Sequence, residues 1–302
     1  MKNVFLFSVQ VSLCLNFFLI SEVAMSSNDD QEHEQLSPDV IENIKIQHIA
    51  SIKTAIIELT NTNENKRRLA GIRLRHLSLR SEGISYSVSK TEVSTIVKQI
   101  ESEKHLAARV AEVSALSEVY HHSLENSDKS AIADILKRLS ANENDIEITL
   151  EAQYQIHLIA KTNEPKDYSV FEKIGLKKSE FVAADTHFGH AVFDFTRLKA
   201  DALIEKSEVV TKALANILSL KTDSIILLEA LDISNQIGNH ASTLFSEIAN
   251  LTGHEFWRIR KISLEILFRA KKLELIKVER KTKLNSDPIP EVLEKVRSFG
   301  LK

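Results

Sequence analysis

The stretch GHEFWRIRKISLEILFRAKK, residues 253–272, is the clearest indication of the fold. At about 100° per residue, its apolar side chains form two adjoining stripes on a helix where a surface helix has one. The first stripe contains Phe256, Ile259, Ser263, Ile266, Leu267 and Ala270, and the second contains Trp257, Leu264 and Phe268. A narrow strip, formed by Arg258, Lys261, Glu265 and Arg269, is left to face water. A helix with two apolar faces packs between neighbours, which predicts a stack of helices.

Composition predicts that the rest of the chain is helical too. The 302 residues include 7 Gly and 4 Pro, whereas average usage is about 7% and 5%. Because a β-rich fold needs many turn residues, we expect an all-α fold. The net charge of −3 gives no global attraction to nucleic acid or to an anionic membrane.

The N-terminal residues have the pattern of an export signal. Residues 1–26 combine Lys2 with an apolar run over residues 4–20 and the small residue Ser26, which is typical of a cleaved signal peptide. We therefore expect a periplasmic or secreted protein with no integral membrane domain after processing. Two alternatives stay open. Translation could start at Met25, giving a cytoplasmic protein, or the run could remain as an uncleaved anchor.

The segment that follows is acidic. Residues 27–37 carry four acidic and no basic side chains, which predicts a flexible leader. Ser37 followed by Pro38 then predicts an N-cap and the first residue of a helix that runs to about Leu59. The single cysteine, Cys14, lies before this point, so the remainder of the chain can form neither a disulfide nor a cysteine-based zinc site.

Short polar breaks then divide residues 38–302 into helices. Breaks of this length connect antiparallel neighbours in helical hairpins. They are TNTNEN (60–65), SEGISYS (81–87), LENSD (124–128), ANEND (141–145), KTNEPKD (161–167), LKTD (220–223), LTGH (251–254) and LNSDP (284–288). The pattern is least regular over residues 168–205.

Small or moderately small residues recur along these helices. They stand at Ala70, Ala111, Ala152, Ala191, Ala230, Ser263 and Val296, separated by 41, 41, 39, 39, 33 and 33 residues. This period suits a two-helix unit in which a small residue allows close approach of the next helix. A compact helical bundle, with these residues as ordinary packing positions, is the alternative.

The same segments resemble HEAT repeats. HEFWRIRKISLEIL, with a small residue three positions after Arg260, looks like the second helix of such a repeat. SDPIPEVLEKVRSFG looks like the Asp-Pro turn and second helix of another, and weaker likenesses begin at NENKRRL and NENDIEI. The resemblance implies an α-solenoid of about six or seven antiparallel helix pairs over residues 38–302, generally used to hold other macromolecules. It implies no catalytic residue and no cofactor.

Metal chemistry has one weak candidate. His187, His190 and Asp194 have the spacing i, i+3, i+7, which would place two imidazoles and a carboxylate on one helix face. Gly189 interrupts that helix, so ordinary surface or core roles are the favoured interpretation. The pair His254-Glu255 resembles a single metal-binding pair of the HEAT-repeat hydroxylases, which need several. No phosphate loop, nucleophile elbow or His-Glu-x-x-His motif is present.

Basic charge is concentrated in two segments. Residues 66–80 contain six Lys or Arg and no acid, and residues 251–302 contain 13 basic and 7 acidic side chains. Clustered arginines can grip an acidic partner by bidentate bonds, although a solvated helix face is the commoner explanation. Because the segments lie far apart in sequence, we expect two separate contact points on one partner. The candidate binding residues are Arg73, Arg75, Arg80, Arg258, Lys261 and Arg269.

Two functional classes follow. The first is a non-catalytic scaffold that binds a protein partner, with nucleic acid disfavoured if the chain is exported. The second is a HEAT-like enzyme or nucleic-acid-binding protein similar to DNA glycosylases or bilin lyases. That class needs a cleft lined by aromatic and acidic residues, with Trp257 and the basic residues 66–80 facing it.

Overall fold

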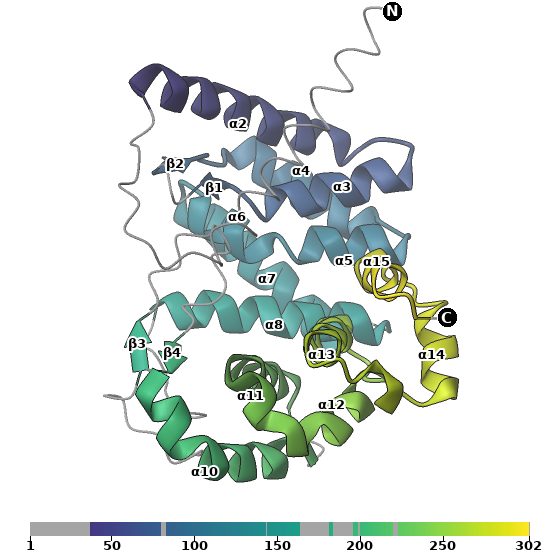
Figure 1. Cartoon of the computed structure of the whole chain (residues 1–302). Coiled ribbons are helices and arrows are strands. Elements are labelled where there is room, and N and C mark those ends of the chain that lie inside the picture. Colours follow the sequence, from purple (N-terminus) through teal and green to yellow (C-terminus); the bar gives the residue numbers. More distant parts are fainter. Residues whose placement is uncertain are drawn as a thin grey trace, which may run out of the picture. The chain divides into compact units, whose positions relative to one another are not determined.

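The prediction of an all-α fold is confirmed (Figure 1). The computed structural model describes residues 37–79, 83–142, 144–163, 181–183, 196–198, 200–219 and 223–301. Its α-helices are α2 (Pro38–Glu58), α3 (Glu64–Leu74), α4 (Lys90–Ser102), α5 (Leu106–Val113), α6 (Leu116–His122), α7 (Asn126–Asn142), α8 (Ile146–Asn163), α10 (Ala200–Ser219), α11 (Ser224–Ile237), α12 (Phe245–Leu251), α13 (Trp257–Arg269), α14 (Val278–Leu284) and α15 (Pro290–Ser298). Two 3₁₀ helices are η3 (Gly238–Leu244) and η4 (Leu273–Leu275).

Two short antiparallel strand pairs interrupt the helices of the described chain. Strand β1 (Ser78–Leu79) pairs with β2 (Ile84–Ser85), and β3 (Phe181–Ala183) pairs with β4 (Thr196–Leu198). Strand β2 falls in the predicted break at residues 81–87, β1 lies just before it, and the second pair falls in the irregular segment 168–205. These positions contain too few residues to form a sheet with a core of its own.

Local sequence signals explain several helix starts. Helix α2 begins at Pro38, and the N–H groups of Val40 and Ile41 bond to the carbonyl of Ser37. The side chain of Asn63 accepts from two N–H groups at the start of α3. A reciprocal capping box joins Ser89 and Glu92 at the start of α4. Each device satisfies N–H groups that have no partner inside the helix.

Several breaks between helices were not predicted, and two of them lie before and after α5. Helices α4 and α5 separate around Glu103, whose carboxylate accepts from the N–H of His105 at 2.8 Å. Helices α5 and α6 separate at Ser114, whose hydroxyl donates to the carbonyl of Ala111 at 2.6 Å. Neither place contains glycine or proline, so composition gave no signal there.

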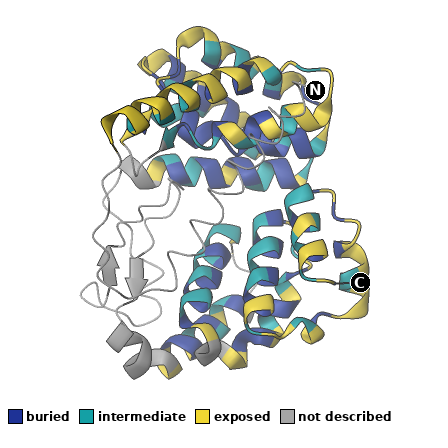
Figure 2. Cartoon of the chain, turned by 45° about the horizontal axis from the view of Figure 1, so that its top comes forward, coloured by how far each residue is buried: buried dark blue, intermediate teal, exposed yellow. Residues whose placement is uncertain are grey.

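Helix α13 is packed on several sides, as its two stripes predict. Ile259, Leu264 and Leu267 are each 0% exposed. Phe268 is different from the prediction: it is 45% exposed and stacks on Phe299 of the segment after α15, with ring centroids 3.9 Å apart. Figure 2 shows the same contrast along the chain, with buried stripes in blue and exposed residues in yellow.

The small residues of the predicted period are core residues wherever they are described. Ala70, Ala152, Ala230, Ser263 and Val296 are 0% exposed, and Ala111 is 1% exposed. The backbones of α3 and α5 approach closely here, because a Cβ at Gly71 would lie 2.7 Å from the carbonyl carbon of Ala111. Ala191 lies outside the described residues.

Neighbouring helices pack in a regular sequence. Helix α7 packs on α8, α10 on α11, α12 on α13, and α14 on α15. Helices that carry the small residues also pack on each other, α3 on α5, α5 on α8, α11 on α13, and α13 on α15. Each helix that carries one of these small residues therefore contacts at least one other helix that carries one.

The chain divides into two compact units, Met1–Asn43 and Ile44–Lys302, with the division inside α2. The predicted signal peptide, residues 1–26, and most of the acidic leader lie outside the described residues. Among the helices that are described, none is long and apolar enough to cross a membrane. All the contacts below belong to the second unit.

Candidate functional site

Three of the candidate binding residues meet around Trp257, the first residue of α13. The guanidinium carbon of Arg75 lies 5.8 Å from the Trp257 ring, and that of Arg258 lies 4.6 Å from it. Lys261 lies one turn further along α13, where burial and the charges of both arginines help to lower its pKa. The two basic segments, expected to be separate contact points, therefore contribute to one place.

The other candidates lie elsewhere. Arg73 pairs with Glu58 of α2 at 3.0 Å, and Arg269 donates to the amide oxygen of Asn235 at 3.0 Å. Arg80 lies outside the described residues. Arg73 and Arg75 project differently because residues two positions apart on a helix do not share a face.

Helix α8 supplies the carboxylate at the centre of this place. Glu151 is 0% exposed and accepts from Arg258 through both oxygens, at 2.8 and 2.9 Å. The indole N–H of Trp257 donates to it at 2.9 Å and the amide of Gln155 at 2.8 Å. Burial by itself would raise the pKa of Glu151, but the charge and hydrogen bonds of Arg258 outweigh it and lower the pKa.

Arg258 has a structural role that the sequence analysis did not anticipate. Its guanidinium carbon lies 4.7 Å from the Tyr154 ring as well as 4.6 Å from Trp257, and its side chain is 19% exposed. Two nitrogens are occupied by Glu151. The prediction that Arg258 faces water as a free contact residue is therefore wrong, because a buried carboxylate holds it against two aromatic rings.

A second buried ion network fixes the start of α13. Arg260 donates to Asp287 through Nε and Nη2, at 2.7 and 2.9 Å, and to Glu147 at 2.7 Å. Its Nη1 bonds to the carbonyls of His254 and Glu255. Burial raises the pKa of Glu147 to about 7, although Arg260 opposes the shift. This network joins α8, α13 and the turn before α15.

Five cations lie close enough to influence one another, and we call them the cation cluster. They are Arg68, Arg75, Arg258, Lys261 and Lys295. The carboxylates of Glu151, Glu265 and Glu291 act on members of this cluster. Glu265 pairs with Lys295 at 2.9 Å, and Glu291 lies 3.4 Å from Arg68.

Two members of the cation cluster have lowered pKa values. Burial, assisted by the charge of Arg258, lowers the pKa of Arg75 to about 10. Burial also lowers the pKa of Lys261, and the charges of Lys295 and Arg258 add to the effect. Arg68, Arg258 and Lys295 each have a carboxylate partner, but Arg75 and Lys261 form no ion pair within the described residues, so like charges are crowded here.

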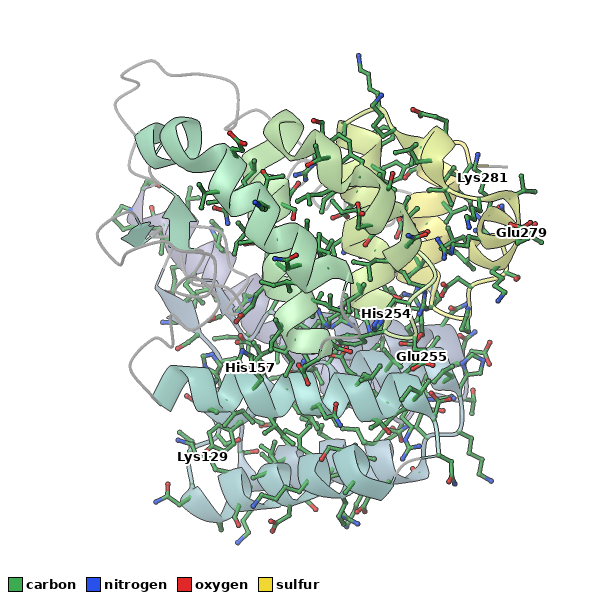
Figure 3. The ribbon with its side chains drawn as sticks, turned by 90° about the horizontal axis from the view of Figure 1, so that it is seen from below. Lys129, His157, His254, Glu255, Glu279 and Lys281 are labelled. Atoms are coloured by element: carbon green, nitrogen blue, oxygen red, sulfur yellow. The ribbon has the colours of Figure 1, made fainter. Side chains whose placement is uncertain are left out.

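The metal candidates give no site in the described part of the chain. His187, His190 and Asp194 lie outside it, and within it no group of three His, Cys, Asp or Glu could hold an ion. In Figure 3, His254 and Glu255 lie together at the turn before α13, apart from His157 on α8. The Nδ1 of His254 accepts from the N–H of Phe256 at 3.0 Å, so this histidine helps to start α13.

The acidic residues of the site, which come from α8, were not predicted. Glu147, Glu151 and Tyr154 have the spacing i, i+4, i+7, so they share one face of α8. That spacing was visible in the sequence, although nothing in it indicated which helix the face would meet. Arg68 was not predicted as a site residue either. Its segment contains six basic residues, and no sequence pattern separates Arg68 from the others.

Comparison with protein-family models finds no matching family, and comparison with curated proteins finds no significant match.

Proposed function

We propose that this chain is a non-catalytic binding scaffold of HEAT-like helix pairs that captures an acidic protein partner at the cation cluster. The observation that carries the proposal is the gathering of Arg68, Arg75 and Lys261 around α13, where the buried Nε and Nη2 of Arg75 have no hydrogen-bond partner and neither Arg75 nor Lys261 forms an ion pair within the described residues. Such a surface attracts and orients an acidic partner and repels a basic one.

The packing order of the helices supports a repeat. Pairs α7–α8, α10–α11, α12–α13 and α14–α15 each pack internally, and second helices pack on one another from α3 through α5 to α8 and from α11 through α13 to α15. Helices α4 and α5 also pack on each other, and we infer that these pairs are consecutive units of a linear stack. Buried small residues at Ala70, Ala152 and Val296 fit the role of close contact points between second helices.

The burial of the aromatic and acidic residues favours a scaffold over the catalytic alternative. Trp257 is 2% exposed and Glu151 is 0% exposed, and both oxygens of Glu151 are occupied by donors. A carboxylate held in this way has no free lone pair aimed at a substrate, and a covered indole offers no stacking face.

Export remains part of the proposal, because residues 1–26 have the pattern of a signal peptide. A periplasmic or secreted location would select an extracytoplasmic protein as the partner. N-terminal sequencing of the protein from its native cell tests this. A mature N-terminus near residue 27 supports export, whereas one at Met25 places the protein in the cytoplasm.

Partner capture tests the scaffold itself. The variant Arg75→Gln/Lys261→Gln removes two charges from the cation cluster while leaving the Glu151–Arg258 contact in place. We expect weaker capture from the native compartment, with the wild-type interaction also weakening in high salt. The control Arg73→Gln removes a charge that is engaged with Glu58. Equal capture by the wild type and the double variant would overturn the proposal.

A further inference from the structure

Three arginines of this protein bind a carboxylate through the Nε and Nη2 edge of the guanidinium. Arg258 uses Nε and Nη2 on Glu151, and Arg260 uses the same two nitrogens on Asp287. Arg67 does so on Glu103. Each pair places two parallel N–H groups against two oxygens, which is the strongest geometry available to arginine.

The same edge of Arg75 is buried and has no hydrogen-bond partner. Its two nitrogens are Nε and Nη2, and the Nε of neighbouring Arg68 is also without a partner. Buried donors without partners cost about 1–3 kcal/mol each, and more when the group is charged. Unpaired charged donors in the interior need an acceptor, and a bound anion would supply one.

The charge of the surroundings indicates how negative that ligand is. Arg258, Lys295 and Arg68 are each paired with a carboxylate, whereas in the described part of the chain neither Arg75 nor Lys261 forms an ion pair, which leaves two positive charges in excess. Glu151 is fully engaged by Arg258, Trp257 and Gln155, so it cannot turn toward Arg75. A ligand with two negative charges would neutralise the excess, whereas one carboxylate would leave half of it.

We propose that Arg75 and Arg68 form a binding site for a phosphate group, held by two of its oxygens on the Nε and Nη2 edge of Arg75. A phosphomonoester carries nearly two negative charges at neutral pH and offers three acceptor oxygens. Lys261 contributes charge from the next turn of α13. The inference rests on the proposed function and specifies its chemistry: the acidic partner presents a phosphorylated side chain.

Trp257 provides a built-in probe of this site. It is the single tryptophan of the chain, and the Arg75 guanidinium lies 5.8 Å from its ring. Because the Arg75 edge is covered in the unliganded protein, an entering phosphate has to shift side chains that surround the indole. Binding should therefore change the intrinsic fluorescence in a saturable way.

The experiment is a fluorescence titration of the full chain with three probes at matched ionic strength. Inorganic phosphate tests the free ion, and a phosphoserine peptide tests the esterified group. The same peptide with glutamate in place of phosphoserine tests a carboxylate. We expect saturation with inorganic phosphate and with the phosphopeptide, and at least about tenfold weaker binding of the glutamate peptide.

Variants assign the response to Arg75. Arg75→Gln should weaken phosphate binding about tenfold or more, and Arg75→Lys should recover only part of it because lysine has no planar fork. Arg73→Gln is the matched control and should bind as the wild type does. Circular dichroism and melting of each variant verify the fold, and Arg75→Lys keeps the test valid if Arg75→Gln is unstable.

Two results would overturn the phosphate site. One is the absence of any saturable change with both phosphate probes, and the other is an unchanged response in folded Arg75→Gln or Arg75→Lys. Tighter binding of the glutamate peptide than of the phosphopeptide would also contradict it. The scaffold proposal is judged separately, because acidic partner capture that depends on Arg75 but ignores phosphate would leave that proposal standing.

Discussion

Single side chains decide how this protein tolerates buried charge. Glu151 is neutralised by Arg258 and satisfied by Trp257 and Gln155, so its charge is stabilised although it is 0% exposed. Glu112 is the opposite case. It is 1% exposed, its Oε2 has no hydrogen-bond partner, and the nearest amide, from Gln99, lies 3.5 Å from Oε1. The two carboxylates therefore respond differently to mutation and pH.

Removing the charge of Glu151 should destabilise the protein. Glu151→Gln leaves Arg258 as a buried cation without its partner, and we expect a loss of about 3–5 kcal/mol in the free energy of unfolding. Urea denaturation followed by circular dichroism measures this. The control Glu58→Gln breaks the exposed pair with Arg73 and should cost less than about 1 kcal/mol. Equal losses would contradict the structural role of Glu151.

Glu112 should make stability depend on pH. Burial, together with the charge of Glu103, raises its pKa from 4.5 to about 8. The folded state then binds the proton more tightly than the unfolded state, so this group lowers stability as pH rises from 4.5 to about 8. Glu112→Gln should therefore stabilise the protein by about 1–3 kcal/mol at about pH 9 and by little at about pH 5. Melting at both pH values tests this, and a pH-independent difference would refute it.

Helices act as units through the faces that they bury. Helix α13 contacts α11, α12 and α15, and its residues Trp257 and Arg258 bond to Glu151 of α8. Helix α3 meets α5 so closely that Gly71 has no room for a side chain. A single substitution at either contact should affect the packing of more than one helix.

The core face of α13 should not accept a charge. Ile259→Asp or Leu267→Asp places a carboxylate at a position that is 0% exposed, and we expect destabilisation by about 3–5 kcal/mol. Lys261→Ala should cost less than about 1 kcal/mol, since it removes a cation from a crowded cluster. Denaturation midpoints compare the three variants. Equal midpoints would show that α13 does not pack as described.

Gly71 should be irreplaceable for steric reasons. Gly71→Ala improves helix propensity by about 1 kcal/mol, but its Cβ would lie 2.7 Å from backbone atoms of Ala111 and Glu112, which cannot move without shifting α5. We expect net destabilisation of about 1–3 kcal/mol. Gly253→Ala is the control, since its Cβ would meet the flexible side chain of Arg280. A melting temperature for Gly71→Ala at or above that of the wild type would contradict this.

At the scale of the whole molecule, helix pairs follow one another with neighbour contacts, α10 on α11, α12 on α13 and α14 on α15. In a linear array of helix pairs, which we propose for this chain, stability is the sum of repeat and neighbour terms, so one end can open while the rest stays folded. A compact bundle would instead unfold as one cooperative unit.

Destabilising the last helix distinguishes the array from the bundle. Val296 of α15 is 0% exposed, so Val296→Asp should disrupt α14 and α15. Hydrogen exchange should then accelerate by at least about tenfold in these helices while the amides of α5 and α8 stay protected as in the wild type. The wild type measured in parallel is the reference. Uniform acceleration over all helices would favour the compact bundle.

Much of the architecture could be predicted because helices are specified by neighbouring residues. Ser37 and Pro38 determined where α2 begins, and the spacing of Ile259 and Leu267 determined the core face of α13. The recurrence of small residues at Ala70 and later positions indicated buried contacts. Each of these patterns involves residues within one or two helical turns of each other, so they can be recognised in the sequence.

The composition of the site was decided by the tertiary structure. Arg258 and Glu151 are 107 residues apart in sequence, and Arg75 reaches the site from α3, a different helix again. The residues next to Arg258 and Arg75 in the sequence do not show how the two side chains differ. Arg258 contacts two aromatic rings, whereas the Nε and Nη2 of Arg75 have no hydrogen-bond partner. The sequence by itself determined that basic residues are concentrated in two segments. Only the packing of α3, α8 and α13 decided which charges are neutralised, because that depends on distances between segments that no local pattern encodes.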